Sequence, residues 1–141
     1  MIAIGSDHGG FELKGHIIEH LKEKGIEVKD FGTYSEASVD YPDCAKPVCK
    51  AVLDGECECG ILICGTGIGI SMAANKFKGI RAALCGDVFS AKMSKEHNNA
   101  NIICMGGRVL GRELANMIVD TYLEAEFKAA DMPTELKKFM K

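Results

Sequence analysis

The chain has 141 residues, of which 47% are hydrophobic and 26% charged, a balance typical of one globular domain with a substantial core. Its formal net charge of -3 argues against a protein that binds nucleic acid or another polyanion. No apolar run is long enough to span a membrane, so an integral membrane protein is not expected.

Short, mostly apolar runs alternate with helical patterns along the whole chain. Five runs are predicted as strands: 2–6, 26–32, 60–65, 80–86 and 100–107. Each is followed by a segment predicted as a helix: 10–25, 41–55, 71–76, 87–98 and 111–127.

The order of these elements predicts the fold class. Near-continuous apolar strands are typical of a sheet that helices cover on both faces. Alternating strand–helix units therefore predict an α/β fold, a doubly wound sandwich with a five-stranded parallel sheet. Residues 1–141 are predicted as a single domain without repeats or linkers, in which 128–141 form a polar tail with one or two helical turns.

Local signals mark the ends of the predicted helices. Gly25 and Gly55 are predicted as helix stops, Pro42 lies near a first turn, and Asp87 is a plausible N-cap. Pro47 is expected to disturb the early part of helix 41–55, because proline lacks the N–H that an inner helical turn needs.

The seven cysteines favour a reducing, cytoplasmic compartment. Their number is odd, and the first residues are typical of a strand, not of a signal peptide. The spacing of Cys57 and Cys59 is not that of a zinc site, so no metal is expected there. His16 and His20 are four residues apart on the first helix, but they lie on its polar flank, where solvation is expected instead.

The ligand site of such a sheet is expected at the carboxyl ends of the strands. Polar and reactive side chains follow several predicted strands, or lie in the helix end before strand 100–107, and are expected to gather there. They are Asp7, His8, Cys64, Thr66, Ser71, His97, Asn98 and Arg108.

A glycine-rich turn, "GTGIG" at 65–69, follows strand 60–65. Its third glycine is one residue too early for the dinucleotide-binding pattern, and no Walker lysine follows, so a nucleotide site is disfavoured. Such a turn can instead present a ring of backbone N–H groups to a phosphate or to an oxyanion formed during a reaction.

Cys64 precedes this turn, where a thiol near a helix N-terminus would form a thiolate readily. The alternative is that Cys64 is one more core thiol, as Cys85 and Cys104 are expected to be. His97 has two similar interpretations, a functional group or a cation that favours a helix C-terminus, and the sequence alone leaves both open.

Several segments in order resemble the type B ribose-5-phosphate isomerases, a family that includes the paired subunits of galactose-6-phosphate isomerase. They are "GSDHGG", "VDYPD", "ILICGTGIGISMAANK", "GIRAALC", "EHNNANIICMGGRVLG" and "IVDTYLEAEF". The resemblance covers about residues 1 to 127. It implies a three-layer Rossmann-like sandwich and a homodimer, sometimes a tetramer, with active sites at the subunit interface. It also implies an isomerase that interconverts aldose and ketose sugar phosphates without metal or cofactor.

The resemblance also implies residue roles. Cys64 matches the base that moves a proton between C1 and C2, although some members use a glutamate that "GIGIS" lacks. His97 matches the acid that helps open the furanose ring. The Gly65 to Gly69 amides, with Thr66, match the hole that stabilises the enediolate. The full set of expected substrate-binding residues is Asp7, His8, Tyr41, Gly65, Gly67, Ile68, Gly69, Ser71, Asn98 and Arg108.

The tail departs from the family pattern. Members usually carry a "GGRHxxR"-like segment whose arginines hold the substrate phosphate, whereas this chain has "EFKAADMPTELKKFMK" at 126–141. Ribose 5-phosphate is the expected substrate. The alternatives are a six- or four-carbon sugar phosphate, a free aldose, a non-catalytic partner subunit, and a module that binds a sugar or nucleotide.

Overall fold

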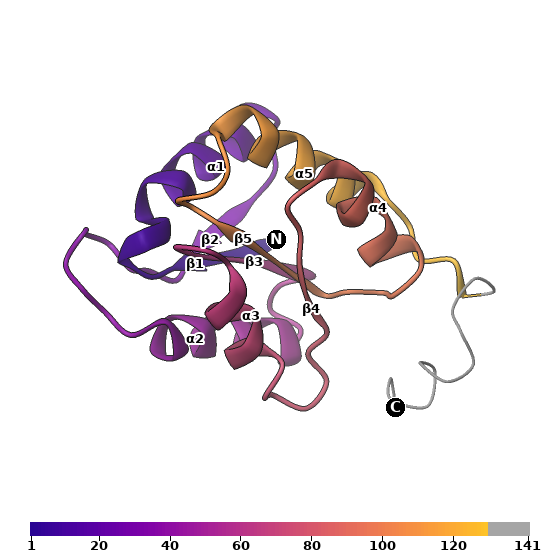
Figure 1. Ribbon diagram of the computed structural model, residues 1–141. Helices are drawn as coiled ribbons and strands as arrows, with labels where there is room; N and C mark the ends of the chain where they lie inside the picture. The colour runs from indigo at the N-terminus through magenta and orange to yellow at the C-terminus, as the bar shows by residue number, and fades with distance from the viewer. Residues whose placement is uncertain (130–141) are drawn as a thin grey trace.

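The computed structural model describes residues 1–129, drawn as a ribbon in Figure 1. Most of the predicted tail, residues 130–141, lies outside the described part. Five parallel strands form one sheet in the order β2-β1-β3-β5-β4. The strands are β1 (Ile2–Ser6), β2 (Val28–Asp30), β3 (Cys59–Cys64), β4 (Ala82–Leu84) and β5 (Ile102–Gly106).

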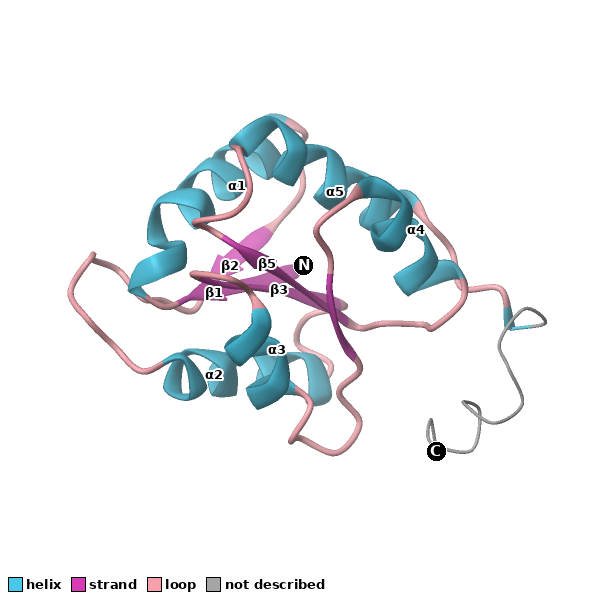
Figure 2. Cartoon of the chain, in the orientation of Figure 1, coloured by secondary structure: helices cyan, strands magenta, loops and turns pink. Residues whose placement is uncertain are grey.

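Helices cover both faces of this sheet, as Figure 2 shows. One face carries α1, α4 and α5 and the other carries α2 and α3, so the expected three-layer Rossmann-like sandwich is confirmed. The helices are α1 (Phe11–Glu23), α2 (Tyr41–Leu53), α3 (Ile68–Ala74), α4 (Val88–Glu96) and α5 (Arg112–Glu124), with a single 3-10 turn η1 (His8–Gly10) before α1.

The core is divided into two clusters by the sheet. Successive side chains of a strand point to opposite faces, so Ile61 and Ile63 pack with α1 and α5. Leu62 and Cys64 pack on the other face, with α2 and α3. The alternation thus places the Cys64 side chain on the α2–α3 side of the sheet, at the end of its central strand.

Two local expectations have different outcomes. Asp87 is the N-cap of α4, as predicted, and its carboxylate accepts from the Ser90 N–H at 2.7 Å. Pro47 was expected to disturb α2, and this is wrong: the helix runs unbroken from Tyr41 to Leu53 with Pro47 inside it.

Candidate active site

Three loops meet at the carboxyl edge of the sheet, after β1, β3 and β5. Their backbones approach so closely that only glycine fits: a Cβ on Gly9 would lie 3.0 Å from the Gly65 nitrogen, and one on Gly107 would lie 2.5 Å from the Gly9 oxygen. The Gly107 N–H donates to the Cys64 carbonyl at 2.8 Å. The sequence predicted that these loops share one edge, and the glycines explain how they come into contact.

Cys64 lies beneath the second loop, where its side chain is 5% exposed. The Gly67 N–H donates to its sulfur at 3.1 Å. Gly67 has φ +84, and a Cβ there would lie 2.5 Å from Leu84 Cδ1, so this position requires glycine. The loop therefore aims an N–H at the thiol, and such a donor stabilises the negative charge of a thiolate. The Gly67 N–H contacts the sulfur directly and is the main source of this stabilisation. The dipole of the following helix, α3, contributes less, because that helix has only seven residues.

The predicted amide ring is partly occupied by the loop's own groups. The Ile68 N–H donates to Thr66 Oγ1 at 3.2 Å, and the Ser71 hydroxyl donates to the Ile68 carbonyl at 2.7 Å. Gly69 lies against Tyr41, because a Cβ there would be 2.8 Å from the Tyr41 ring. The structure thus places Thr66, Ile68, Gly69, Ser71 and Tyr41 together at the carboxyl edge, and an oxyanion would share or replace these contacts.

Asp7 and His8 follow β1 and belong to the first loop. Asp7 is nearly buried, and its Oδ1 accepts from the N–H groups of Gly9 and Gly10 at 2.8 and 3.2 Å. His8 Nδ1 accepts from the Val39 N–H at 3.2 Å. Because a backbone N–H can only donate, neutral His8 carries its proton on Nε2 in this arrangement.

Arg108 lies over the second loop, since a Cβ on Gly65 would be 3.5 Å from its Nη1. It shares a cavity of about 300 Å³ with His8 and with the carboxylates of Glu12 and Glu36. The adjoining hollow holds Arg112, again beside Glu12. The cavity is therefore large enough for a small phosphorylated sugar, and both basic and acidic side chains line it.

His97 and Asn98 were expected at the same edge, and within one chain this is wrong. They precede β5, in the turn that ends α4, and the neighbouring Asn101 carbonyl accepts from the N–H of Gly60 at the start of β3. From there to the level of Cys64 the strands run four residue steps, roughly 13 Å at the usual rise of a strand. The topology thus places the two residues at the amino edge.

The turn that carries His97, residues 97–101, is held firmly. Arg81 Nε donates to the Asn99 carbonyl at 2.7 Å, and Asn99 adopts a left-handed conformation with φ +51. The fully buried Tyr122 donates its hydroxyl to the Ala100 carbonyl at 2.6 Å. Sequence reasoning missed this network, because Arg81 and Tyr122 are far from the turn along the chain and nothing in the sequence marks Tyr122 as buried against it.

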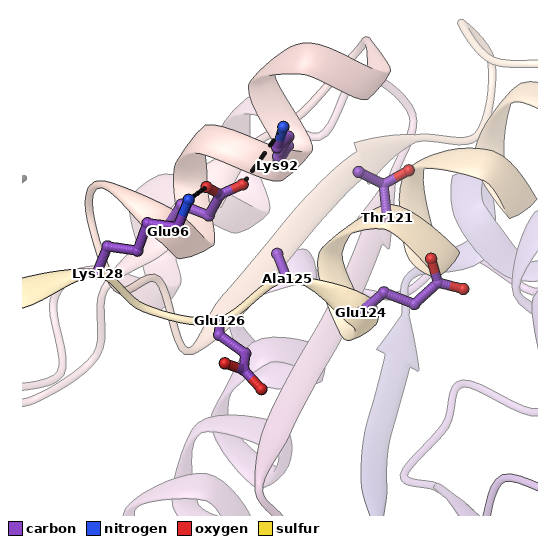
Figure 3. Close-up of a pocket in the computed structure, with 7 residues that line it drawn as sticks. All are labelled: Lys92, Glu96, Thr121, Glu124, Ala125, Glu126 and Lys128. Atoms are coloured by element: carbon purple, nitrogen blue, oxygen red, sulfur yellow. Dashed lines mark ion pairs between the residues drawn. The ribbon is translucent and has the colours of Figure 1, made fainter.

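A further hollow, of about 390 Å³, lies between the ends of α4 and α5 at the amino edge (Figure 3). The Glu96 carboxylate forms ion pairs there with Lys128 Nζ at 2.8 Å and with Lys92 Nζ at 3.7 Å. The hydrogen bond from Lys128 is the main reason that the pKa of Glu96 lies below its usual value. The chain therefore enters its tail beside His97.

Metal-ligand clusters and membrane-spanning helices are absent from the described residues, 1–129. In that range no three His, Cys, Asp or Glu side chains gather closely enough to hold a metal ion. None of the helices there combines the length and the apolar character that crossing a membrane requires. His20 is not simply solvated, because its Nε2 lies 2.8 Å from the Asp120 carboxylate on α5.

The fold and the site are typical of a class of proteins: α/β proteins that bind small metabolites at the carboxyl end of the central strands, where this chain places Cys64. The model of the ribose/galactose isomerase family matches residues 2–139. The chain belongs to this family, and the expectation of an aldose–ketose isomerase is confirmed at the level of enzyme class.

Individual relatives agree with this assignment. The chain is 54% identical to ribose-5-phosphate isomerase B of Escherichia coli over 127 residues, covering 90% of this chain and 85% of that protein. It is 46% identical to the galactose-6-phosphate isomerase subunit LacB of Clostridium acetobutylicum, with coverage of 98% and 80%. The structure of Clostridium thermocellum ribose-5-phosphate isomerase B superposes with a TM-score of 0.91 at 54% identity, covering 99% of this chain and 91% of that one.

Proposed function

We propose that this protein interconverts ribose 5-phosphate and ribulose 5-phosphate through an enediolate, with Cys64 as the base. The observation that carries the proposal is the thiol at the end of β3, with the Gly67 N–H on its sulfur and Arg108 over the adjacent Gly65. The names of the relatives in Escherichia coli and Clostridium thermocellum support the choice of substrate.

The chemistry follows from a thiolate at this position. The Cys64 sulfur takes the C2 proton of the open-chain aldose, and the electron pair forms the C1–C2 double bond while negative charge develops on O1. The loop amides and the Thr66 hydroxyl stabilise this charge. A proton then moves from O2 to O1, and the thiol returns its proton to C1 to give the ketose. A positioned base supplies about 10²–10⁴-fold, and each oxyanion donor about 10²–10³-fold.

The phosphate is assigned to the cavity that His8 and Arg108 share. An arginine can hold a phosphate in a bidentate geometry, whereas a lysine offers a flexible point charge. Glu12 and Glu36 in the same cavity weaken the attraction of an anion. We therefore expect phosphate recognition to depend mainly on Arg108 and to be sensitive to salt.

Ring opening requires an acid near the substrate, and in one chain His97 is at the opposite edge of the sheet from Cys64. A homodimer removes this difficulty if His97 of the partner subunit, with Asn98 of the partner subunit, reaches the carboxyl edge. The network that fixes residues 97–101 supports such a role, because a general acid must be held in place. A tetramer built from such dimers remains compatible with this proposal.

The similarity to subunit LacB favours one second candidate, an isomerase of a six-carbon sugar phosphate that works beside a different subunit. A substrate panel separates the two. Purified protein is given ribose 5-phosphate, six- and four-carbon aldose phosphates and free ribose, and ketose formation is measured. Highest kcat/KM on ribose 5-phosphate supports the first proposal. A higher kcat/KM on another sugar phosphate would identify that compound as the substrate instead. If the pure protein turns over none of these sugars, the proposal is overturned.

A further inference from the structure

Lys14 is a buried cation that the proposed chemistry does not use. It lies on α1, and its side chain is 1% exposed, although lysine is almost never found so deep without partners. Its Nζ donates to Asp30 Oδ1 at 2.7 Å and to the Thr33 carbonyl at 2.5 Å. The same nitrogen lies 5.6 and 5.3 Å from the ring centres of Phe11 and Tyr34. Every one of these partners except Phe11 belongs to the end of β2 or to the segment that follows it.

That segment is the β2–α2 loop, residues 31–40. It begins at the Lys14 cluster, where Asp30 Oδ1 also accepts from the Gly32 N–H at 2.9 Å and the Tyr34 hydroxyl donates to the Asp30 carbonyl at 3.1 Å. Near its other end, the Val39 N–H donates to His8 Nδ1. In between, residues 34–38 are exposed, and Glu36 lines the cavity of His8 and Arg108.

The two ends of this loop have different anchors. The end that Lys14 holds is tied to the sheet and to α1, whereas the far end is tied to the imidazole of His8 and leads into α2 at Tyr41. The exposed middle has little packing of its own to keep the loop in place. The position of the Val39 N–H, and with it the orientation and proton position of His8, therefore depends on how both the Lys14 end and α2 hold the loop.

We infer that Lys14 is a positioning residue of the active site: it fixes the β2–α2 loop so that Val39 holds His8 in the tautomer that presents Nε2–H to the cavity. The inference rests on the proposed function for the role of His8 toward the phosphate. An Nε2–H donor in a fixed direction recognises a phosphate oxygen better than a ring that rotates or changes tautomer.

The kinetic test compares Lys14→Met with Lys29→Met. Lys29 is a matched control, since it also pairs with a carboxylate, Glu56 at 2.6 Å, and lies 5.0 Å from the Phe31 ring, but it does not touch the loop's cavity end. Lys14→Met is expected to raise KM for ribose 5-phosphate about threefold to tenfold, the size of one weakened hydrogen bond, with kcat within about twofold. Lys29→Met is expected to change neither constant.

A double-mutant cycle shows whether Lys14 acts through His8. If it does, Lys14→Met has no further effect on KM in a His8→Ala background, because the group it positions is gone. An equal rise in KM in both backgrounds, or a fall in kcat as large as the rise in KM, would overturn the inference. Tyr34→Leu is the milder variant if Lys14→Met does not fold: Tyr34 is 72% exposed, yet its ring and hydroxyl both belong to the cluster.

A readout that needs no turnover separates this inference from the proposed function. Nitrogen-15 NMR of the imidazoles, at a pH where histidine is neutral, is expected to show His8 with a bare Nδ1 and a protonated Nε2 in the wild type and in Lys29→Met. The spectrum of His8→Gln identifies the His8 signals, because they are missing from it. Lys14→Met, or Tyr34→Leu, is expected to give a mixture of tautomers, and an unchanged tautomer in both overturns the role of Lys14. A wild type inactive on every sugar would overturn the proposed function and leave this test valid.

Discussion

At the scale of single residues, Cys64 decides the chemistry. We expect Cys64→Ala to lower kcat by about 10²–10⁴-fold and to leave KM within a few-fold, because a base contributes mainly in the transition state. Steady-state kinetics on the purified variant measure both constants. Cys104→Ala is the control, since it removes a fully buried thiol from the neighbouring strand. Near-normal kcat in folded Cys64→Ala would exclude the assignment.

Arg108 decides the preference for a phosphate ester. We expect Arg108→Ala to reduce kcat/KM for ribose 5-phosphate about tenfold to a hundredfold, the cost of one charge-assisted contact. Turnover of free ribose should change little. Arg112→Ala is the comparison, because that side chain lines only the adjoining hollow beside Glu12, and a smaller loss is expected. If wild type turns over free ribose as well as its phosphate, the substrate assignment is wrong.

Residue-level sequence reasoning succeeded where a residue's place along a strand decides its surroundings. Asp7, His8, Cys64 and Arg108 follow strands of one parallel sheet, so their common edge could be predicted. Lys14 could not be found in this way. Its neighbours along the chain give no sign that a lysine is buried, and its partners come from β2 and the loop after it, far away in the sequence.

At the scale of elements, the N-cap of α4 contributes to stability in a way that depends on pH. The N–H of Ser90, followed by its hydroxyl, lowers the pKa of Asp87 below its ordinary value of 3.8. A depressed carboxyl pKa stabilises the fold above the unfolded pKa, and this contribution is lost as pH falls through the folded pKa.

Asp87→Ala is therefore expected to lower the free energy of unfolding at neutral pH. The difference from wild type begins to shrink near the ordinary pKa of 3.8 and is lost only as pH falls through the lower folded pKa. Urea unfolding at several pH values measures this. Ser90→Ala keeps the backbone donor, so a smaller difference of the same sign is expected. A pH-independent gap between Asp87→Ala and wild type would contradict this explanation.

The turn at residues 97–101 depends on α5 through one hydroxyl. Tyr122→Phe removes the donor and leaves the buried Ala100 carbonyl without it, so we expect a loss of roughly 1–3 kcal/mol in the free energy of unfolding. Chemical denaturation provides the measurement. Tyr34→Phe removes the hydroxyl of an exposed side chain, which donates to the Asp30 carbonyl at the end of β2, and should cost much less. Equal losses would show that burial of the hydroxyl is unimportant.

Element boundaries show where apolar patterns mislead. Residues 26–32 and 80–86 were predicted as strands, but only Val28–Asp30 and Ala82–Leu84 pair. Both are edge strands with a neighbour on one side only, so fewer hydrogen bonds hold their ends in the ladder. Among the fully buried inner strands, β1 was predicted with its observed bounds and β3 within one residue at each end, whereas β5 begins two residues later and ends one residue earlier than predicted.

At the scale of the whole molecule, the separation of His97 from Cys64 makes a prediction about subunits. Cys64→Ala and His97→Ala are each expected to be inactive as homodimers. After unfolding and refolding as an equal mixture, heterodimers should regain up to about a quarter of wild-type activity, since half of the dimers then hold one intact site of two under two-fold symmetry. Sedimentation measures whether dimers form, and turnover measures how many intact active sites they contain.

The outcome of that mixture is decisive in both directions. No recovery from a mixture that forms dimers would place both residues in one subunit's site and contradict the shared site. An active monomer would overturn the homodimer. Residues 97 and 98 precede strand 100–107 in the sequence, so a parallel sheet already implied the amino edge. The expectation failed because it grouped all polar residues that lie near strand ends, whichever end they flank.

The environment of the other six thiols, of which Cys44 is half-buried and five are buried, has a practical consequence for counting active sites. Desolvation raises the pKa of Cys49 and Cys59 to about 11, and it also raises the pKa of Cys44, Cys57, Cys85 and Cys104. Thiols held protonated at neutral pH react slowly with electrophiles. An electrophilic sugar phosphate, such as an epoxide or halo-ketone analogue, would therefore act as a titrant for Cys64 alone. Its labelling stoichiometry, read as a mass increase of the intact chain, would report the fraction of competent protein in any preparation without a single cysteine having to be replaced.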